Sequence, residues 1–248
     1  MKTYVDTSRL IVREINKNLA KKMIMTHHYS HKWSSCRYAL GLFYEMDNEH
    51  AFFDEKEEKL IGVAIYGYPV GRLAAGSISS YLKPDEVLEL TRLFIFDDYG
   101  SNIESYFLSQ TFKWLKQNDK TIKGLVSYSD PEQNHQGTIY QATNWIYQGN
   151  SIRLMKNYGI KLTENGVWMH SRTVSATFGS HNVEHLKKKI GHTFWRKEEP
   201  EKHRYVYLLC NKKDKKKIMD TIKHPPLPYP KFTEYKEYIE EIQVDERI

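Results

Sequence analysis

A short polar segment, SYSDPEQN, follows a run of apolar residues and contains side chains that could bind a substrate amine. Asp130 comes directly after an expected strand, at the edge where open α/β sheets usually bind ligands. A carboxylate at that edge can accept a proton from an amine. Because Pro131 ends the strand, the alternative is that Asp130 only caps the backbone of its own turn. The residues alone leave both interpretations open.

A second polar segment, HHYSH, closes the first expected helix. His27 and His31 are four residues apart, so a helix could direct both at one metal ion, but no Asp or Glu stands among them to complete a site. We therefore favour a histidine-rich helix end and expect no metal. A third interpretation places His28, Tyr29 and Ser30 in a cleft, where His can transfer a proton near neutral pH and Tyr can donate to a carbonyl.

The periodicity of apolar residues predicts the elements that position these segments. We expect strands at residues 8–15, 36–46, 59–69, 87–98 and 122–130, and a late hairpin formed by 156–162 and 166–174. We expect helices at residues 16–29, from 101 onward, and within 136–149. Ser101 followed by Glu104 has the spacing of a capping box, which predicts the start of the second helix. The pattern predicts an α/β (α+β) fold but leaves several such folds open.

Composition and length limit the class of protein. The chain has 248 residues, 13% of them aromatic, which favours one main folded domain over disorder. No apolar run approaches the roughly 18 residues that span a bilayer, and the N-terminus lacks the apolar core of a signal peptide. Cys36 and Cys210 stand apart without metal-ligand spacing, as is typical of a reducing compartment. We therefore expect a cytoplasmic protein without a membrane contact.

Positive charge is concentrated late in the sequence. The net charge is +6, and residues 179–224 contain 13 Lys and Arg against 6 Asp and Glu. Aromatic residues interleave with these cations, a composition typical of surfaces that contact nucleic-acid phosphates and stack on bases. The alternative is a solvated, lysine-rich helix face. We expect the nucleic-acid contacts at Lys187, Lys188, Lys189, Arg196, Lys212 and Lys213, and rings for stacking at Phe194, Trp195, Tyr205 and Tyr207.

The C-terminal region divides into two parts. The proline-rich PPLPYPK forms an extended segment, because proline fixes its own φ and disfavours helix before it. The acidic end that follows is expected to form a terminal helix or to fray, and we assign it no function. We predict a catalytic core at 1–174, a basic subregion at 175–231 and an acidic tail at 232–248.

Two stretches carry a resemblance to a known family: residues 89–116 (ELTRLFIFDDYGSNIESYFLSQTFKWLK) and 124–149 (GLVSYSDPEQNHQGTIYQATNWIYQG). With HHYS upstream and the basic C-terminal segment, they resemble the phage Mom proteins over residues 20–231. The resemblance implies a GNAT-like fold, with a mixed, mostly antiparallel central sheet flanked by helices. It also implies a transferase that modifies adenine N6 in double-stranded phage DNA to the carbamoylmethyl form, which protects the DNA from host restriction in the host cytoplasm.

The resemblance also implies site residues. The matching catalytic positions are His28, Tyr29, Ser30 and Asp130, and the matching positions for substrate or donor are Arg92, Ser127, Tyr128, Tyr140, Asn144, Gly100 and Ser101.

The expected cofactor site departs from the acetyltransferase pattern. Enzymes of this fold hold the CoA pyrophosphate on a Q/R-x-x-G-x-G/A loop, but here Asp97 replaces the cation or amide and Asn102 replaces the last small residue. Carboxylates beside a pyrophosphate would repel it, so the small-molecule donor, acetyl-CoA or another, stays open.

Two alternatives to adenine modification remain at this stage. One is a GNAT-type N-acetyltransferase that uses acetyl-CoA on a small amine or a protein, and the other is a non-catalytic, basic DNA-binding module. The sequence does not name the oligomeric state.

Overall fold

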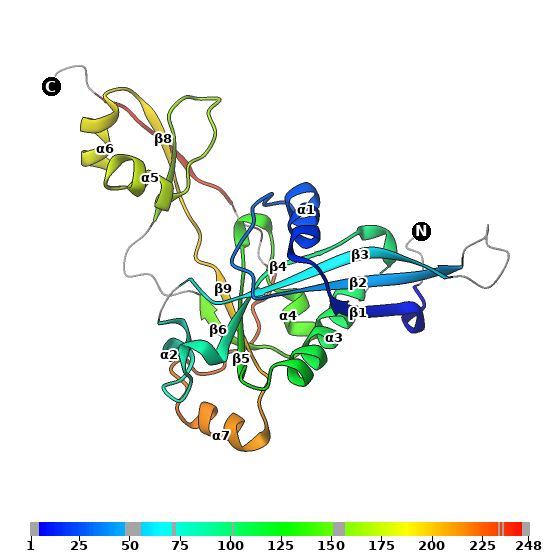
Figure 1. The fold of residues 1–248 in the computed structure, drawn as a ribbon. Coiled ribbons are helices and arrows are strands. Elements are labelled where there is room, and N and C mark those ends of the chain that lie inside the picture. Colours follow the sequence, from blue (N-terminus) through cyan, green and yellow to red (C-terminus); the bar gives the residue numbers. More distant parts are fainter. Residues whose placement is uncertain are drawn as a thin grey trace. The chain divides into compact units, whose positions relative to one another are not determined.

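The structure is a computed structural model that describes residues 5–47, 56–70, 73–100, 102–150, 157–232, 234 and 236–244. Seven strands form one sheet in the order β1-β2-β3-β4-β5-β9-β6 (Figure 1). Their bounds are β1 Leu10–Glu14, β2 Tyr38–Asp47, β3 Lys56–Gly67, β4 Val87–Ile95, β5 Gly124–Ser129, β6 Ile146–Asn150 and β9 His203–Leu208. A second sheet has the order β10-β8-β7, with β7 Tyr158–Lys161, β8 Phe194–Glu198 and β10 Ile239–Ile242.

Seven α-helices accompany these strands among the described residues. They are α1 Lys17–His27, α2 Ala74–Ile78, α3 Ile103–Asn118, α4 Thr138–Ala142, α5 Ser171–Phe178, α6 Val183–Ile190 and α7 Lys212–Asp220. Short 3-10 turns are η1 Thr7–Arg9, η2 Pro84–Glu86, η3 Asp97–Tyr99 and η4 Pro131–Gln133. None of the helices in the described ranges is long and apolar enough to cross a membrane.

The chain folds into two compact units, each built from several segments. The first comprises Met1–Tyr128, Gly137–Gly149 and Arg204–Tyr229, and the second comprises Ser129–Gln136, Asn150–His203 and Pro230–Ile248. Because these units interleave along the sequence, the division at 174 and 231 stays a prediction about function and does not describe the packing.

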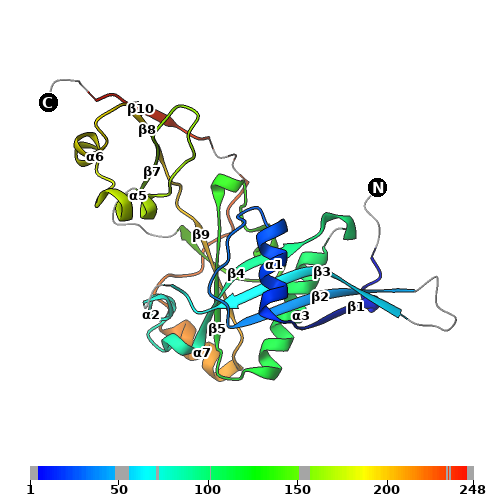
Figure 2. The same cartoon turned by 45° about the horizontal axis from the view of Figure 1, so that its top comes forward.

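In the first unit, two helical layers enclose the large sheet (Figure 2). Side chains of a strand alternate between faces, so Leu40 and Leu125 lie in the core under α3 and α4. The adjacent Ala39 lies under α1, and Val126 lies under α2 and α7. The predicted mixed, mostly antiparallel sheet flanked by helices is confirmed.

The second unit has its own core on one face of the three-stranded sheet. Ile160, Phe194 and Ile242 come from its three strands and pack with Val174 of α5 and Leu186 of α6. The expected helical or frayed C-terminal tail is wrong, because Ile239–Ile242 pairs with β8 as strand β10. The second arm of the late hairpin is also wrong in part: Met169 bridges Ile160, but a helix begins at Ser171.

Other boundaries also differ from the sequence pattern. Helix α3 begins at Ile103 with Asn102 as its N-cap, in the left-handed region at φ 70° and without a side-chain cap. The predicted cap Ser101 lies outside the described residues. The residues after α4 form strand β6 rather than continuing the helix.

Candidate functional site

The site is built where two parallel strands of the first unit separate. Strands β4 and β5 pair in parallel over Val87–Glu89 with Gly124–Val126. Just past this register, the Leu90 carbonyl accepts a hydrogen bond from the Ser127 hydroxyl at 2.9 Å. A side chain thus satisfies a backbone acceptor beside the end of the paired segment, and its hydroxyl lies at the point where the strands diverge.

Tyr140 of α4 completes a hydroxyl pair at this point. Its phenol oxygen lies 2.8 Å from the Ser127 Oγ. Because Ser127 donates its one proton to Leu90, Tyr140 donates to Ser127, and the phenol oxygen keeps lone pairs that can accept a hydrogen bond. The Tyr140 ring is held by Trp145 and Tyr205, with centroids at 5.1 and 4.9 Å. The pair is therefore rigidly positioned.

The surroundings keep Tyr140 protonated at physiological pH. Burial raises the pKa of Tyr140 to about 12, against an opposing contribution from its hydrogen bond with Ser127. Electrostatic contributions from Tyr29 and Glu89 add to the rise. These couplings bring Tyr29, from the HHYSH segment, and Glu89, which the sequence did not single out, into the neighbourhood of Ser127 and Tyr140.

The HHYSH segment itself forms the C-terminal end of α1. His28 is buried, and its Nδ1 accepts from the Ser30 backbone N–H at 3.1 Å, with the Ser30 hydroxyl at 2.9 Å. The neutral imidazole therefore carries its proton on Nε2. His27 instead stacks on Phe94, and His31 Nδ1 contacts the Met25 carbonyl. The two histidines four residues apart thus have separate partners.

Arg92 fixes the segment that follows HHYSH against β4. Its Nε donates to the Lys32 carbonyl at 3.0 Å, and its Nη1 donates to the Thr91 carbonyl. The Ser34 hydroxyl donates to Thr91 Oγ1 at 2.8 Å in the same region. Arg92 therefore positions the segment after α1 through backbone contacts.

A separate cavity of about 700 Å³ is lined by residues of α3, of the segment before it, of the N-terminal segment and of the end of α4. Gly100 and Asn144, two of the predicted donor-binding residues, both line it, together with Phe112 and Tyr207. Its other lining residues are Val5, Thr7, Leu10, Tyr99, Asn102, Ile103, Ser105, Tyr106, Ser109, Ala142 and Thr143. The lining is uncharged, consisting of hydroxyls, an amide pair and rings, so the cavity favours a neutral group.

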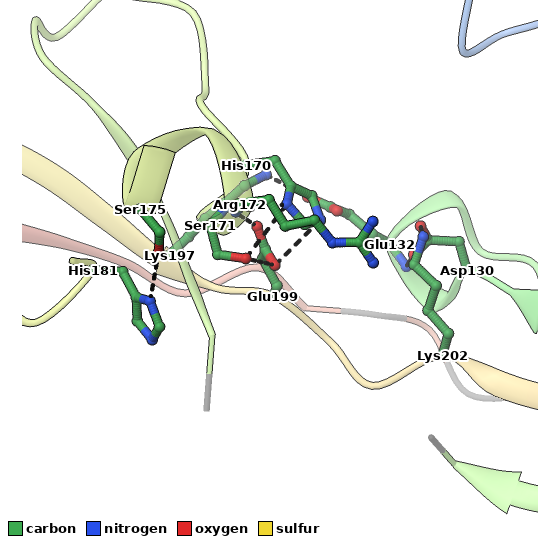
Figure 3. A network of polar contacts seen from close by, with 10 residues as sticks. All are labelled: Asp130, Glu132, His170, Ser171, Arg172, Ser175, His181, Lys197, Glu199 and Lys202. Carbon is green, nitrogen blue, oxygen red and sulfur yellow. Dashed lines mark hydrogen bonds and ion pairs between the residues drawn. The ribbon is translucent and has the colours of Figure 1, made fainter. Parts of the chain in front are cut away.

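Asp130 lies in the second unit, where it serves its own turn and an ion pair. Its carboxylate caps η4 by accepting from the Glu132 N–H at 3.1 Å, and it pairs with Lys202 at 2.8 Å (Figure 3). Turn capping, one of the two interpretations from the sequence, is therefore present. The role of Asp130 as a proton acceptor stays a prediction.

A polar network surrounds the first turn of α5 in the second unit (Figure 3). Glu199 is buried and accepts from the backbone N–H and the hydroxyl of Ser171 at 2.7 and 2.8 Å. His170 Nδ1 caps α5 by accepting from Arg172 N, and its Nε2 lies 3.4 Å from Glu199. These contacts satisfy the first amides of α5 and account for the network as a helix cap.

The predicted DNA-contacting cations are divided between the units. Lys187, Lys188 and Lys189 lie on α6 of the second unit, whereas Lys212 and Lys213 are exposed on α7 of the first. The second unit carries 13 Lys and Arg against 13 Asp and Glu, so the whole excess charge belongs to the first unit.

The structure bears on two features of the predicted basic surface. Arg196 pairs through its Nε with Glu240 of β10 at 2.5 Å, and its contact with DNA stays a prediction. The expectation that Phe194 and Tyr205 offer rings for stacking is wrong, since both side chains are fully buried. Trp195 is half-buried and lies beside Lys161, whose ammonium is 5.4 Å from the ring centroid.

The fold and the site define a class: a mixed α/β protein with a half-buried Ser–Tyr hydroxyl pair at the divergence of two parallel strands. The sequence model of the Mom protein family matches residues 9–231, and the chain belongs to that family. It is similar to the methylcarbamoylase mom of Escherichia phage Mu, with 25% identity over 231 residues that cover 91% of this chain and 85% of the relative.

Solved N-acetyltransferases are also similar to the chain. The spermidine/spermine N-acetyltransferase SpeG from Vibrio cholerae matches 82% of this chain and 94% of its own at 8% identity and a TM-score of 0.43. The ribosomal-protein-S5-alanine acetyltransferase from Vibrio fischeri matches 83% and 96% at 11% identity and a TM-score of 0.42.

The residues at the start of α3 do not fit the pyrophosphate of CoA. Asp97 and Asp98 belong to η3 directly before Gly100, and among the described residues no Lys or Arg lines the adjoining cavity. The amides at the start of a helix favour an anion, but two carboxylates beside them oppose it. Of the predicted donor-binding loop, Ser101 is outside the described residues. We derive no step through CoA.

Proposed function

We propose that the protein is a transferase that places a carbamoylmethyl group on N6 of adenine in DNA, as its family membership and its similarity to the phage Mu methylcarbamoylase suggest. The observation that carries the proposal is the meeting of separate segments at one place. Ser127 and Tyr140 form the hydroxyl pair where β4 and β5 diverge, and Tyr29 lies within electrostatic reach of it.

The reaction requires help that this arrangement can supply. The lone pair of adenine N6 is delocalised into the ring, so N6 must be held against an activated methylene carbon and must lose a proton as the N–C bond forms. The Tyr140 oxygen can accept one N6–H hydrogen bond and orient the amine. Asp130 is the proposed proton acceptor, and the leaving group departs with the bonding pair of the attacked carbon.

Access to N6 requires the base to leave the duplex. Enzymes that act on a base extrude it and hold it between rings while they read its edge. Tyr128, whose pKa is raised by burial, is the proposed stacking partner. It follows Ser127 on β5 and therefore lies on the opposite face of the sheet from the Ser127–Tyr140 pair. Asn144 remains a proposed contact to the donor, since it lines the uncharged cavity.

The direct test is mass spectrometry of nucleosides from plasmid DNA co-expressed with the protein. We expect a deoxyadenosine whose mass is raised by one carbamoylmethyl group, and none with an empty vector. Unmodified DNA together with turnover of acetyl-CoA on an amine would replace the proposal with an acetyltransferase. Unmodified DNA with tight DNA binding and no turnover would leave a binding module.

DNA binding itself supplies a separate prediction. Replacing Lys187, Lys188 and Lys189 together by Glu should weaken binding across all sequences and reduce the slope of log K against log salt by about 2 to 3, because each phosphate contact contributes about 0.9. The comparison variant is Lys212→Glu with Lys213→Glu, which removes the predicted contacts on α7 and should reduce the same slope by about 2. Fluorescence anisotropy with a labelled duplex measures both variants, and unchanged binding at low salt would remove α6 from the DNA surface.

A further inference from the structure

Arg204 is a buried cation that has no role in the proposed transfer reaction. It lies on β9 in the first unit, and only 7% of the residue is exposed. Its Nη2 donates to the Ser77 hydroxyl at 2.8 Å. Its Nε is buried and has no hydrogen-bond partner among the described residues. The guanidinium therefore has one N–H donor, at Nε, that is shielded from solvent and has no acceptor among the described residues.

Comparison with Arg37 shows why a buried guanidinium without a carboxylate partner is unusual. Arg37 also has a buried Nε without a partner in the described ranges, but its Nη2 pairs with the buried carboxylate of Asp119 at 2.8 Å. No salt bridge of this kind reaches Arg204 from any described residue. A buried charge without a counter-ion is strongly destabilising, so such a group is normally paired. Among the described residues, no anion forms a salt bridge with Arg204.

The surroundings of Arg204 connect it to Tyr128 on the neighbouring strand β5. Val126 and Val206 lie in one core cluster, and side chains two residues along a strand share a face, so Tyr128 and Arg204 lie on that face. Electrostatic coupling also joins them: Arg204 opposes the rise in the pKa of Tyr128 that burial causes, and Glu89 adds to that rise. Glu89 also couples to Tyr140. The unpaired cation thus lies beside the proposed base-stacking residue.

We infer that Arg204 binds a phosphate of the nucleotide that carries the target adenine. The inference rests on the proposed function and names the part of the DNA that this site holds. A guanidinium recognises phosphate oxygens with two parallel N–H donors, and Nε with a neighbouring Nη provides such a pair. A phosphate in a duplex stays at the surface, but an extruded nucleotide brings its own phosphate toward the protein interior. The missing counter-ion therefore arrives with the substrate.

Binding can be followed at the Arg204 Nε–H itself. Its proton–nitrogen NMR signal, assigned by its loss in Arg204→Gln, is titrated with deoxyadenosine 5′-monophosphate, deoxyadenosine, inorganic phosphate and acetate. We expect the monophosphate to shift the signal and to bind at least about 10-fold more tightly than inorganic phosphate, because only the monophosphate combines the phosphate contact with a base that can stack on Tyr128. Deoxyadenosine and acetate should cause no shift. The Arg37 Nε–H signal, already neutralised by Asp119, should not move.

Each other outcome of the titration overturns the inference. An equal shift from deoxyadenosine would assign Arg204 to the base edge. A shift from acetate without one from the monophosphate would assign it to a carboxylate of the donor. Equal affinity for inorganic phosphate would indicate an adventitious ion only. If the signal does not shift at millimolar monophosphate, Arg204 does not bind the phosphate of the nucleotide.

Variants separate binding from a structural role. Arg204→Gln should weaken monophosphate binding about 10- to 100-fold, while its melting temperature stays the same or rises, since a desolvated charge is removed. Arg204→Lys should recover part of the affinity, because it keeps the charge but not the paired donors. The matched control Arg37→Gln should lower the melting temperature, since it leaves Asp119 unpaired, and should leave monophosphate binding unchanged.

The binding result is independent of the modification result. If the wild-type protein binds the monophosphate through Arg204 but plasmid adenine is unmodified, the proposed reaction is wrong and the phosphate site stands. If plasmid adenine is modified but Arg204→Gln binds the monophosphate normally and melts at a lower temperature, the phosphate site is wrong and the proposed reaction stands.

Discussion

Tyr140→Phe is expected to lower the fraction of modified adenine in co-expressed plasmid DNA by about 100-fold or more, the usual effect of losing a group that orients or exchanges a proton in the transition state. The reason is geometric. The Tyr140 hydroxyl donates to Ser127 and leaves an oxygen lone pair directed away from that bond. Phenylalanine keeps the ring between Trp145 and Tyr205 and removes only this oxygen.

The control for this prediction is Tyr66→Phe. Tyr66 is fully buried in the same core cluster against which the half-buried Tyr140 packs, and its hydroxyl lies 2.6 Å from Thr111 Oγ1. Both variants therefore remove one hydroxyl from a hydrogen-bonded pair. Each should cost about 1 kcal/mol of folding free energy. Only Tyr140→Phe should lose modification. Equal, small losses in both variants would make the Ser127–Tyr140 pair a packing feature.

A double-mutant cycle refines the prediction. Ser127→Ala removes the acceptor for Tyr140 and the donor to Leu90. If the two hydroxyls act as one unit, the double variant Ser127→Ala with Tyr140→Phe should modify adenine no less than the worse single variant. Additive losses, measured by the same nucleoside assay, would mean that the hydroxyls contribute separately.

The parts of the fold that sequence could predict are those with local signals. Helix α1 and strands β2 to β5 follow from apolar periodicity within each segment. Strand β6 was missed because its partner is β9, which comes from a distant segment and lies between β5 and β6. Strand β10 was missed because its acidic sequence has no strand pattern until it is paired with the basic β8. The periodicity within one short segment cannot show which distant segment that strand pairs with.

The same limit explains the errors at the basic surface. Phe194 and Tyr205 stand next to cations in sequence, and neighbouring side chains in a strand point to opposite faces. A cation on one side therefore says nothing about the exposure of the ring beside it. Alternation in HRYVYL does place Arg204 on the face of Val206 and Leu208, and that signal could have identified a buried arginine.

The candidate site divides along similar lines. Ser127, Tyr128, Tyr29 and Tyr140 were predicted from a resemblance. The structure joins Ser127 and Tyr140 by a hydrogen bond, and Tyr29 contributes electrostatically to the raised pKa of Tyr140. Glu89 was missed because one carboxylate within an apolar strand is usually interpreted as a solvent-exposed residue and not as a site residue.

Asp130→Asn is expected to lower modification by about 100- to 10,000-fold, the range for loss of a positioned proton acceptor. Asparagine keeps the size of the side chain and can still accept from the Glu132 N–H that now caps η4. The lost ion pair with Lys202, which is 41% exposed, should cost less than about 1 kcal/mol. Thermal melting should therefore change little while modification nearly vanishes.

Lys202→Gln is the matched control, because it breaks the same ion pair from the other side and leaves the carboxylate of Asp130 in place. If the carboxylate accepts the N6 proton, Lys202→Gln should keep most of the modification that Asp130→Asn loses. If Asp130 serves only the turn and the ion pair, the two variants should lose equal, small amounts of stability, and both should modify adenine normally. Nucleoside mass spectrometry and melting curves on the two variants decide between these roles, and a stable Asp130→Asn protein with normal modification would end the catalytic one.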